Sequence, residues 1–291
     1  AVKAAFAEVH KIDALMSKYK RDSDVSRFNE SGADVWVDVN PLTFTVLEES
    51  HRIAELTGGA FDATVLPLST LWGFWPVRQL KIPSDEEIRG ALSHIGYRKL
   101  SLDRANYTLL KSDPDVKVDL GGIAKGYAVD RAIEILRQKG LRDALVEIGG
   151  ETRAMGRNKT GKLWRIAVLH PSKTGYLNIL ELSNRAVATS GDYMNRFIVH
   201  GKSYCHVIDP RTGRPISNGI CSVTVIAENC TQADALATAV PVMGVEEGRQ
   251  LIESLPGTEA IVARRTNHGK GIEVLVSTGL KGLRFSGGAS V

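Results

Sequence analysis

The stretch Val118-Asp119-Leu120-Gly121-Gly122-Ile123-Ala124-Lys125-Gly126-Tyr127-Ala128-Val129-Asp130 organises the middle of the chain. A short apolar segment runs into a pair of glycines. An amphipathic helical pattern then follows to Gln138, and Gly140 is suited to end it. We therefore predict an extended segment, a glycine turn and a helix. Such a turn lets the backbone approach a ligand closely, and the N–H groups of a helix start favour an anion. A phosphate-bearing ligand and an ordinary loop both stay open.

Two phosphate-binding motifs are nearly matched, but both fail. The dinucleotide fingerprint G-x-G-x-x-G would need glycine where Ile123 stands. Residues 156–162 have the spacing of a Walker loop, but Leu163 follows where Ser or Thr is required. The residues after Leu163 are typical of a strand instead of a helix. We interpret this segment as a basic hairpin loop.

The composition is that of a globular protein with an ample core. The chain has 291 residues, of which 43% are hydrophobic and 24% charged, enough for one large or two small domains. The net charge of +4 comes without a dense Lys/Arg run, so we expect no nucleic-acid partner. No apolar run approaches the roughly 18 residues of a membrane span. The first residue is not methionine, which is compatible with removal of a targeting segment.

Cysteine use argues against a zinc or iron–sulfur protein. The three cysteines, Cys205, Cys221 and Cys230, form no C-x-x-C pair. Their odd number leaves at least one free thiol, and one disulfide would fit an export compartment. For Cys230 we favour a buried, inert thiol.

The hydrophobic periodicity predicts helices in the first part of the chain and mostly strands after the central helix. The predicted helices cover residues 1–20, 41–56, 84–94, 124–138, 231–240 and 245–254; the predicted strands cover 35–39, 98–102, 106–110, 116–118, 144–148, 152–155, 163–169, 177–182, 186–189, 197–200, 203–208, 221–227, 259–263 and 272–276. Residues 21–24 are expected to break the first helix. No linker separates two domains, and we predict one α+β unit with a long mixed or antiparallel sheet.

Asp234 and Thr238 are the first candidates for chemistry. They are four residues apart on a predicted helix, which places both oxygens on one face. A carboxylate and a hydroxyl, completed by carbonyl and phosphate oxygens, suit a hard cation such as Mg²⁺. A structural alternative is that Thr231 caps the helix and Asp234 caps it reciprocally.

His206 is the second candidate, because it stands at the end of a predicted strand and beside a turn. It can act as a general base or bond a carbonyl structurally. A hydrolase triad with Ser190 lacks the G-x-S-x-G motif. The aromatic segment 71–76 can line a flat heterocycle or fill the core, and we favour the core for each Trp.

Taken together, these segments resemble the ApbE-type FAD:protein FMN transferases over nearly the whole chain. The matching motifs occur in order at 16–19 with 22–29, 58–62, 71–74, 119–127, 149–151, 189–192, 206–213 and 231–238. The resemblance implies an α+β, T-fold-like single domain over residues 1–291 with a largely antiparallel sheet and flanking helices. It also implies FAD as substrate, Mg²⁺ as cofactor, and transfer of FMN to a Ser/Thr of a target redox protein with release of AMP.

The resemblance assigns a role to individual positions. Asp234, Thr238 and the Gly122 carbonyl correspond to the metal ligands, and His206 to the residue that deprotonates the acceptor hydroxyl. The expected FAD contacts are Tyr19, Ala60, Phe61, Asp62, Asp119, Lys125 and Ile208. An early strand that contacts FAD in family members would lie before the first residue, so we expect that it was trimmed or that part of the flavin pocket is missing. Ala237 replaces an Asp of some relatives, and Gly121-Gly122 replaces Ser-Ala or Ser-Thr.

Two other activities stay open, namely Mg-dependent hydrolysis of FAD and non-catalytic binding of FAD as a partner of a membrane redox complex. The resemblance further implies a periplasmic protein, often held at the inner membrane by a lipid anchor, and an acceptor protein in a membrane redox complex.

Overall fold

The computed structural model describes residues 1–74, 81–172, 174–192, 196–199, 202–266 and 271–281. These residues form two compact units, each built from separate segments. The first unit comprises residues 1–8, 125–196 and 217–291, and the second comprises 9–124 and 197–216. Helices and antiparallel sheets occur in both, which confirms the predicted α+β class. The single domain over residues 1–291 stays a prediction.

A six-stranded sheet forms the centre of the first unit, and all its neighbouring strands are antiparallel. Its order is β15 (Ile272–Val276), β14 (Glu259–Arg265), β13 (Ile220–Ala227), β8 (Arg185–Gly191), β5 (Glu151–Met155) and β4 (Ala144–Ile148). Every residue of β13 is buried. A strand with both faces covered needs apolar or small residues throughout, and β13 has them.

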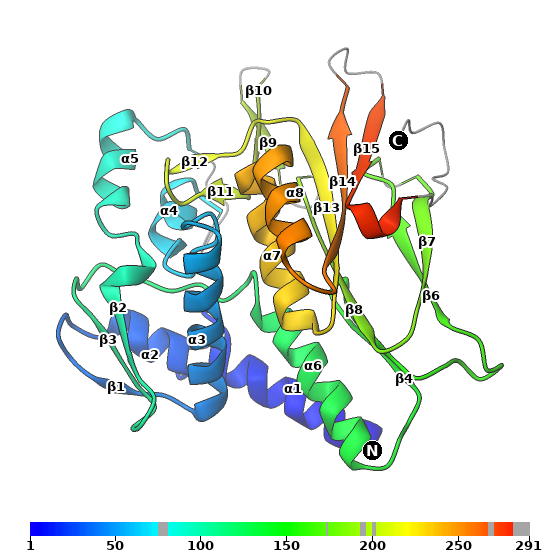
Figure 1. Cartoon of the computed structure of the whole chain (residues 1–291). Coiled ribbons are helices and arrows are strands. Elements are labelled where there is room, and N and C mark those ends of the chain that lie inside the picture. The colour runs from blue at the N-terminus through cyan, green and yellow to red at the C-terminus, as the bar shows by residue number, and fades with distance from the viewer. Residues whose placement is uncertain (75–80, 173, 193–195, 200–201, 267–270, 282–291) are drawn as a thin grey trace. The chain divides into compact units, whose positions relative to one another are not determined.

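The two faces of this sheet are covered differently (Figure 1). The hairpin of β6 (Trp164–Leu169) and β7 (Tyr176–Leu182) packs on one face, where Leu177 and Leu180 contact Val187 and Ile226. On the other face, α6 (Ala124–Gln138) and α7 (Cys230–Met243) pack against β8. The helix α8 (Val245–Ser254) lies beside α7. The small side chain of Ala186 lets the helices approach the strand closely.

The second unit is mainly helical around a small antiparallel sheet of order β1-β3-β2. Its strands are β1 (Val37–Asp38), β2 (Leu100–Asp103) and β3 (Thr108–Lys111), and its helices are α2 (Asp24–Glu30), α3 (Pro41–Leu56), α4 (Leu66–Leu71), α5 (Asp85–Leu92) and the 3₁₀ turn η1 (Tyr97–Lys99). Two short strand pairs complete it, β9 (Arg196–Val199) with β10 (Lys202–Cys205) and β11 (Ile208–Asp209) with β12 (Arg214–Pro215). The helix α1 (Val2–Met16) begins in the first unit and continues into the second, and η2 (Thr278–Leu280) belongs to the first.

Helix starts in the second unit follow the local sequence. The predicted capping box is present at α5, where Ser84 and Glu87 exchange side-chain and backbone hydrogen bonds. The first helix, however, ends at Met16, earlier than predicted. Residues 21–24 do not simply break the chain, because the Ser23 hydroxyl accepts from the Ser26 N–H and starts α2.

The approach to the glycine turn is held by side chains, and the strand predicted at 116–118 is wrong. There, Lys117 makes one isolated parallel bridge to Val65. The Asn29 side chain forms hydrogen bonds with both backbone groups of Val118: its Oδ1 accepts from the Val118 N–H at 2.7 Å, and its Nδ2 donates to the Val118 carbonyl at 2.9 Å. The buried Lys111 ammonium donates to three backbone carbonyls nearby, and burial lowers its pKa.

We expect Asn29→Ala to lower the free energy of unfolding by about 1–3 kcal/mol, because both polar groups of buried Val118 lose their partner. Asn106→Ala is the control, since Asn106 bonds Asp103 in an exposed turn. That variant should change stability by less than about 0.5 kcal/mol. Urea unfolding of both variants measures the difference, and equal effects would contradict this role of Asn29.

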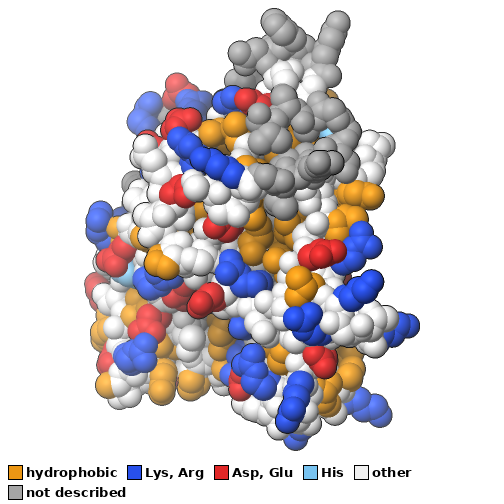
Figure 2. All heavy atoms as spheres, turned by 45° about the vertical axis from the view of Figure 1, so that its right-hand side comes forward, with side chains coloured by type: hydrophobic (Ala, Val, Ile, Leu, Met, Phe, Trp, Pro, Cys, Tyr) orange, Lys and Arg blue, Asp and Glu red, His pale blue; other side chains and the backbone are white. Residues whose placement is uncertain are grey.

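The surface carries mixed side chains. Figure 2 shows hydrophobic side chains interspersed with charged ones of both signs over the face that it presents. Within the described residues, no helix combines the length and apolar character needed to cross a membrane.

Candidate active site

Three charged side chains meet in the first unit at the start of α6. The Lys125 ammonium forms an ion pair with Glu151 Oε1 and lies 3.7 Å from Asp234 Oδ1. The side chains of Glu151 and Asp234 are 3% and 6% exposed, whereas that of Lys125 is 43% exposed. Two buried carboxylates therefore share one partly accessible ammonium.

Asp234 reaches this place because α6 and α7 approach each other at Gly126. The Gly126 N–H donates to Asp234 Oδ2 at 3.0 Å. A Cβ at position 126 would lie 2.2 Å from the Cys230 carbonyl oxygen and 2.8 Å from Asp234 Cβ, so only glycine allows this contact. The N–H group of Gly126, near the start of α6, therefore binds the carboxylate of Asp234 and not an external anion.

A second carboxylate, Asp130 of α6, fixes the start of α7. Asp130 accepts from the backbone N–H groups of Cys230 and Thr231 at 2.9 and 2.8 Å, and from the Thr231 hydroxyl at 2.6 Å. Its Oδ1 also accepts from Arg153 at 2.6 Å. All its oxygens have partners, so Asp130 is a structural anchor that sets the register of α7 on α6.

The capping alternative for Asp234 is wrong. The N-cap of α7 is Asn229, whose side chain accepts from the Gln232 N–H at 2.8 Å. Thr231 lies inside the helix and donates to Asp130 instead. Asp234 bonds another helix and not its own. Its burial therefore has no explanation in helix capping.

The environment alters the acidity of all three groups. Burial, followed by the charge of Asp234, raises the pKa of Glu151 to about 7. Burial also raises the pKa of Asp234, although Lys125 opposes this. For Lys125, burial disfavours the charged form, but the two carboxylates outweigh it and raise its pKa.

The donors present here fit a hard divalent cation. With both carboxylates ionised, the cluster has one more negative than positive charge. Within the described residues, Glu151 Oε2 is buried and has no hydrogen-bond partner. Buried carboxylate oxygens that lack donors are ligands suited to Mg²⁺. Thr238 lies one turn after Asp234 on α7, as predicted. Gly122 belongs to the second unit, and the three-residue ligand set stays a prediction.

Asp119, an expected FAD contact in the second unit, shapes the glycine turn. Its Oδ1 accepts from the Gly121 N–H at 2.9 Å, which closes a local turn. Its Oδ2 pairs with Lys18 Nζ at 2.5 Å. The side chain thus holds the backbone at Gly121 and orients a lysine, and its contact with FAD stays a prediction.

Asp62 is buried and already surrounded by donors of the second unit. It accepts from the backbone N–H and hydroxyl of Thr64, at 2.8 and 2.7 Å, and from the Tyr97 N–H at 2.8 Å. Burial raises its pKa, and these hydrogen bonds oppose the shift. Its carboxylate has a structural role in this unit, the preceding Ala60 and Phe61 are buried as well, and the contacts of all three residues with FAD stay predictions.

The other expected FAD contacts differ in exposure. Ile208 is buried in a cluster with Leu68, Trp72 and Ile88, whereas Tyr19 is exposed. Trp72 also donates from its indole to the Gly213 carbonyl at 2.8 Å, which confirms its core role. Residues 75–76 of the aromatic segment lie outside the described residues. The contacts of Tyr19 and Ile208 with a ligand stay predictions.

His206 follows β10 and is half-buried in the second unit. Ser190 lies in the first unit, on β8, where it is paired with Val223 of β13. The general-base role of His206 stays a prediction.

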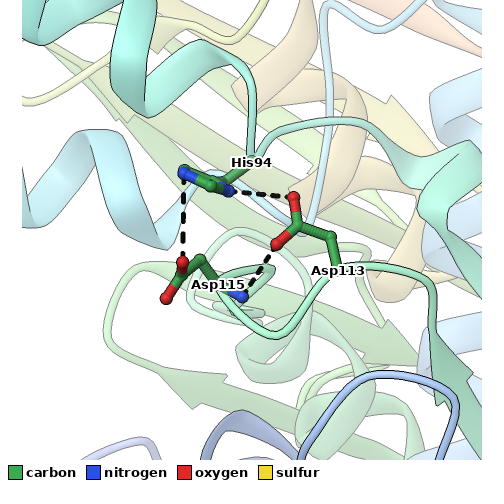
Figure 3. Close-up of side chains that lie close together, drawn as sticks. All are labelled: His94, Asp113 and Asp115. Atoms are coloured by element: carbon green, nitrogen blue, oxygen red, sulfur yellow. Dashed lines mark hydrogen bonds and ion pairs between the residues drawn. The ribbon is translucent and has the colours of Figure 1, made fainter.

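A separate cluster of His94, Asp113 and Asp115 is an ion-paired turn that sequence reasoning did not single out (Figure 3). His94 Nδ1 lies 2.8 Å from Asp113 Oδ2, and His94 Nε2 lies 4.0 Å from Asp115 Oδ2. The Asp115 N–H donates to Asp113 Oδ1 at 2.9 Å, and Lys99 Nζ lies 3.4 Å from Asp113 Oδ2. Both Asp113 oxygens already have partners, whereas Glu151 Oε2 has none within the described residues, so this cluster is less suited to a cation than Asp234 and Glu151.

Sequence reasoning missed the roles of Gly126, Asp130 and Glu151. Glu151 directly follows two glycines that both have positive φ angles, 64° at Gly149 and 107° at Gly150. A carboxylate at the end of a glycine turn was the signal available for it. The contacts of Gly126 and Asp130 join residues about 100 positions apart, which no local pattern reveals.

Solved flavin transferases share this fold. The flavin transferase ApbE from Vibrio cholerae aligns with a TM-score of 0.86 at 36% identity, over 97% of this chain and 91% of that one. The apo flavinyl transferase ApbE of Pseudomonas stutzeri gives a TM-score of 0.87 at 36% identity, over 100% and 90% of the two chains.

Residues 1–262 match the model of the ApbE family, and the chain belongs to this family. Among its relatives, the FAD:protein FMN transferase of Vibrio cholerae is 43% identical over 249 residues, 84% of this chain and 74% of the relative. The FAD:protein FMN transferase of Haemophilus influenzae is 40% identical over 83% and 72% of the two chains. The resemblance drawn from the motifs is confirmed.

Proposed function

We propose that the chain is an FAD:protein FMN transferase, which moves FMN from FAD to a Ser or Thr hydroxyl of an acceptor protein and releases AMP. The cluster of buried Asp234 and Glu151 with the partly exposed Lys125 is the observation that carries this function for the chain's own residues. The two carboxylates can bind a divalent cation, and the ammonium can bind the oxygens of a diphosphate. The names of the relatives supply the substrate class.

In the proposed reaction, the acceptor hydroxyl oxygen bonds to the flavin-side phosphorus while the phosphoanhydride P–O bond breaks and AMP leaves. The hydroxyl proton passes to His206. Lys125 offsets negative charge on the diphosphate. Asp234, Thr238 and the Gly122 carbonyl would hold Mg²⁺. When bound, Mg²⁺ neutralises the charge that develops on the leaving oxygen.

Mass spectrometry tests this function. A Ser/Thr acceptor domain is incubated with the protein, FAD and Mg²⁺, and we expect an adduct of the mass of an esterified FMN together with AMP. AMP release without any acceptor, and without an adduct, would identify an FAD hydrolase. FAD that stays intact with acceptor and Mg²⁺ present would identify a binding protein without turnover.

We also propose that the acceptor belongs to a membrane redox complex and that transfer takes place in the periplasm, with a lipid anchor holding the enzyme at the inner membrane. These proposals rest on the family alone. Cell fractionation of the full-length protein, followed by flavin fluorescence of the membrane proteins, is the test. Recovery of both the protein and the flavinylated acceptor in the cytoplasm would overturn them.

A further inference from the structure

Glu151 has contacts unlike those of the structural carboxylates in this protein. It is the first residue of β5, directly after the Gly149-Gly150 turn, and its side chain is buried. One of its oxygens, Oε1, forms the ion pair with Lys125. The other oxygen, Oε2, is buried and, within the described residues, has no hydrogen-bond partner.

The buried carboxylates of Asp62 and Asp130 differ from Glu151 in their hydrogen bonds. Asp62 accepts three hydrogen bonds and Asp130 accepts four, so each anchors backbone or side chains through both oxygens. Burying a carboxylate oxygen without a donor costs free energy. A residue kept only for folding would be expected to have both oxygens satisfied. Glu151 contacts one partly exposed ammonium instead.

The position of Lys125 depends on this contact. Its ammonium lies 3.7 Å from Asp234 Oδ1, a distance longer than a hydrogen bond, and its closest partner is Glu151. The Gly149 turn packs alongside, since a Cβ there would lie 3.5 Å from Lys125 Cδ and 3.6 Å from Glu151 Oε2. The lysine stem thus runs beside the turn, and Glu151 fixes its charged end.

We propose that Glu151 is the positioning residue for Lys125: it holds the lysine ammonium beside Asp234, in the orientation needed to receive the FAD diphosphate. The inference rests on the proposed function, because it takes FAD as the ligand. Glu151 acts through Lys125, so its effect on FAD binding depends on the presence of that lysine.

A double-mutant cycle tests this dependence. Equilibrium binding of FAD is measured by flavin fluorescence, with Mg²⁺ and without acceptor, for the intact protein, Glu151→Gln, Lys125→Ala and the double variant. We expect Glu151→Gln to weaken FAD binding about tenfold when Lys125 is present. In the Lys125→Ala background, the same change should alter the dissociation constant less than about twofold. An equal loss in both backgrounds would show a merely structural role and overturn the proposal.

Two further variants complete the test. Glu147→Gln is the matched control, because Glu147 is an exposed carboxylate on the same hairpin that accepts from the Gly150 N–H. It should bind FAD like the intact protein. Glu151→Asp keeps the charge but shortens the side chain, and it should lose less affinity than Glu151→Gln. Thermal unfolding verifies that each variant folds. If Glu151→Gln does not fold, Glu151→Asp takes its place in the double-mutant cycle.

The outcomes separate the two proposals. Intact protein that binds FAD, with Glu151→Gln binding equally well, overturns the inference and leaves the function standing. Intact protein that binds no FAD rejects the function and this inference together.

Discussion

Replacing Asp234 with asparagine is expected to lower the rate of FMN transfer by about 10³-fold. Asparagine keeps an oxygen that can accept from the Gly126 N–H, so the packing of α6 on α7 is retained. The negative charge is lost, however, and with it the attraction for a cation and for the Lys125 ammonium. We expect the variant to fold normally but to transfer FMN slowly.

Calorimetry with Mg²⁺ gives a measurement that is independent of turnover. Asp234→Asn should lose detectable Mg²⁺ binding, while Asp115→Asn, in the other carboxylate cluster, should bind Mg²⁺ like the intact protein. Transfer that continues within threefold of the normal rate, or Mg²⁺ binding lost in Asp115→Asn instead, would place the cation elsewhere.

Replacing Gly126 with alanine is expected to lower the free energy of unfolding by about 3 kcal/mol. The new Cβ would lie 2.2 Å from the Cys230 carbonyl oxygen and 2.7 Å from its carbonyl carbon. These are backbone atoms of α7, so no side-chain rotation can relieve the overlap. The two helices must separate, which also moves Asp234 away from Lys125, and transfer should be lost.

Gly90 offers the matched control, because it also lies inside a helix but has open space around it. Among the described residues beyond its own helical turn, no atom lies within 4 Å of the place that a Cβ would take. Gly90→Ala should therefore raise the free energy of unfolding by about 0.5–1 kcal/mol through helix propensity. Urea unfolding measures both variants. A Gly126→Ala protein as stable as Gly90→Ala would show that the helix contact is not tight.

Sequence patterns predicted the helices and strands whose bounds are set by residues close to them in the chain. The helix α3 has the predicted bounds because Pro41 stands at its first turn and Asn40 caps it. Similarly, α8 was predicted at 245–254 and β4 at 144–148, both with their observed bounds. Short elements were missed: α2 and α4 have only seven and six residues, too few for a periodic pattern to be seen.

The candidate site was predictable in part. The resemblance singled out Asp234 and Lys125, which the structure brings together, and Thr238, whose role as a ligand stays a prediction; the i, i+4 spacing alone left capping open. The capping alternative is wrong because the first N–H groups of α7, those of Cys230 and Thr231, donate to Asp130 of α6. The role of Gly126 became visible only when the fold brought residues far apart in the chain into contact, whereas Glu151 had its glycine turn as a local signal.

The segmented construction of the second unit has a consequence for biosynthesis. The Trp72 indole donates to Gly213, 141 residues further along, and Ile208 of the same late segment packs against it. During translation, the ribosome releases residues 9–124 long before residues 197–216 appear. The Trp72 indole therefore lacks its partner while the 141 residues up to Gly213 are synthesised. We expect a nascent chain stopped before residue 197 to bind chaperones at this apolar surface, and to release them once the late segment emerges.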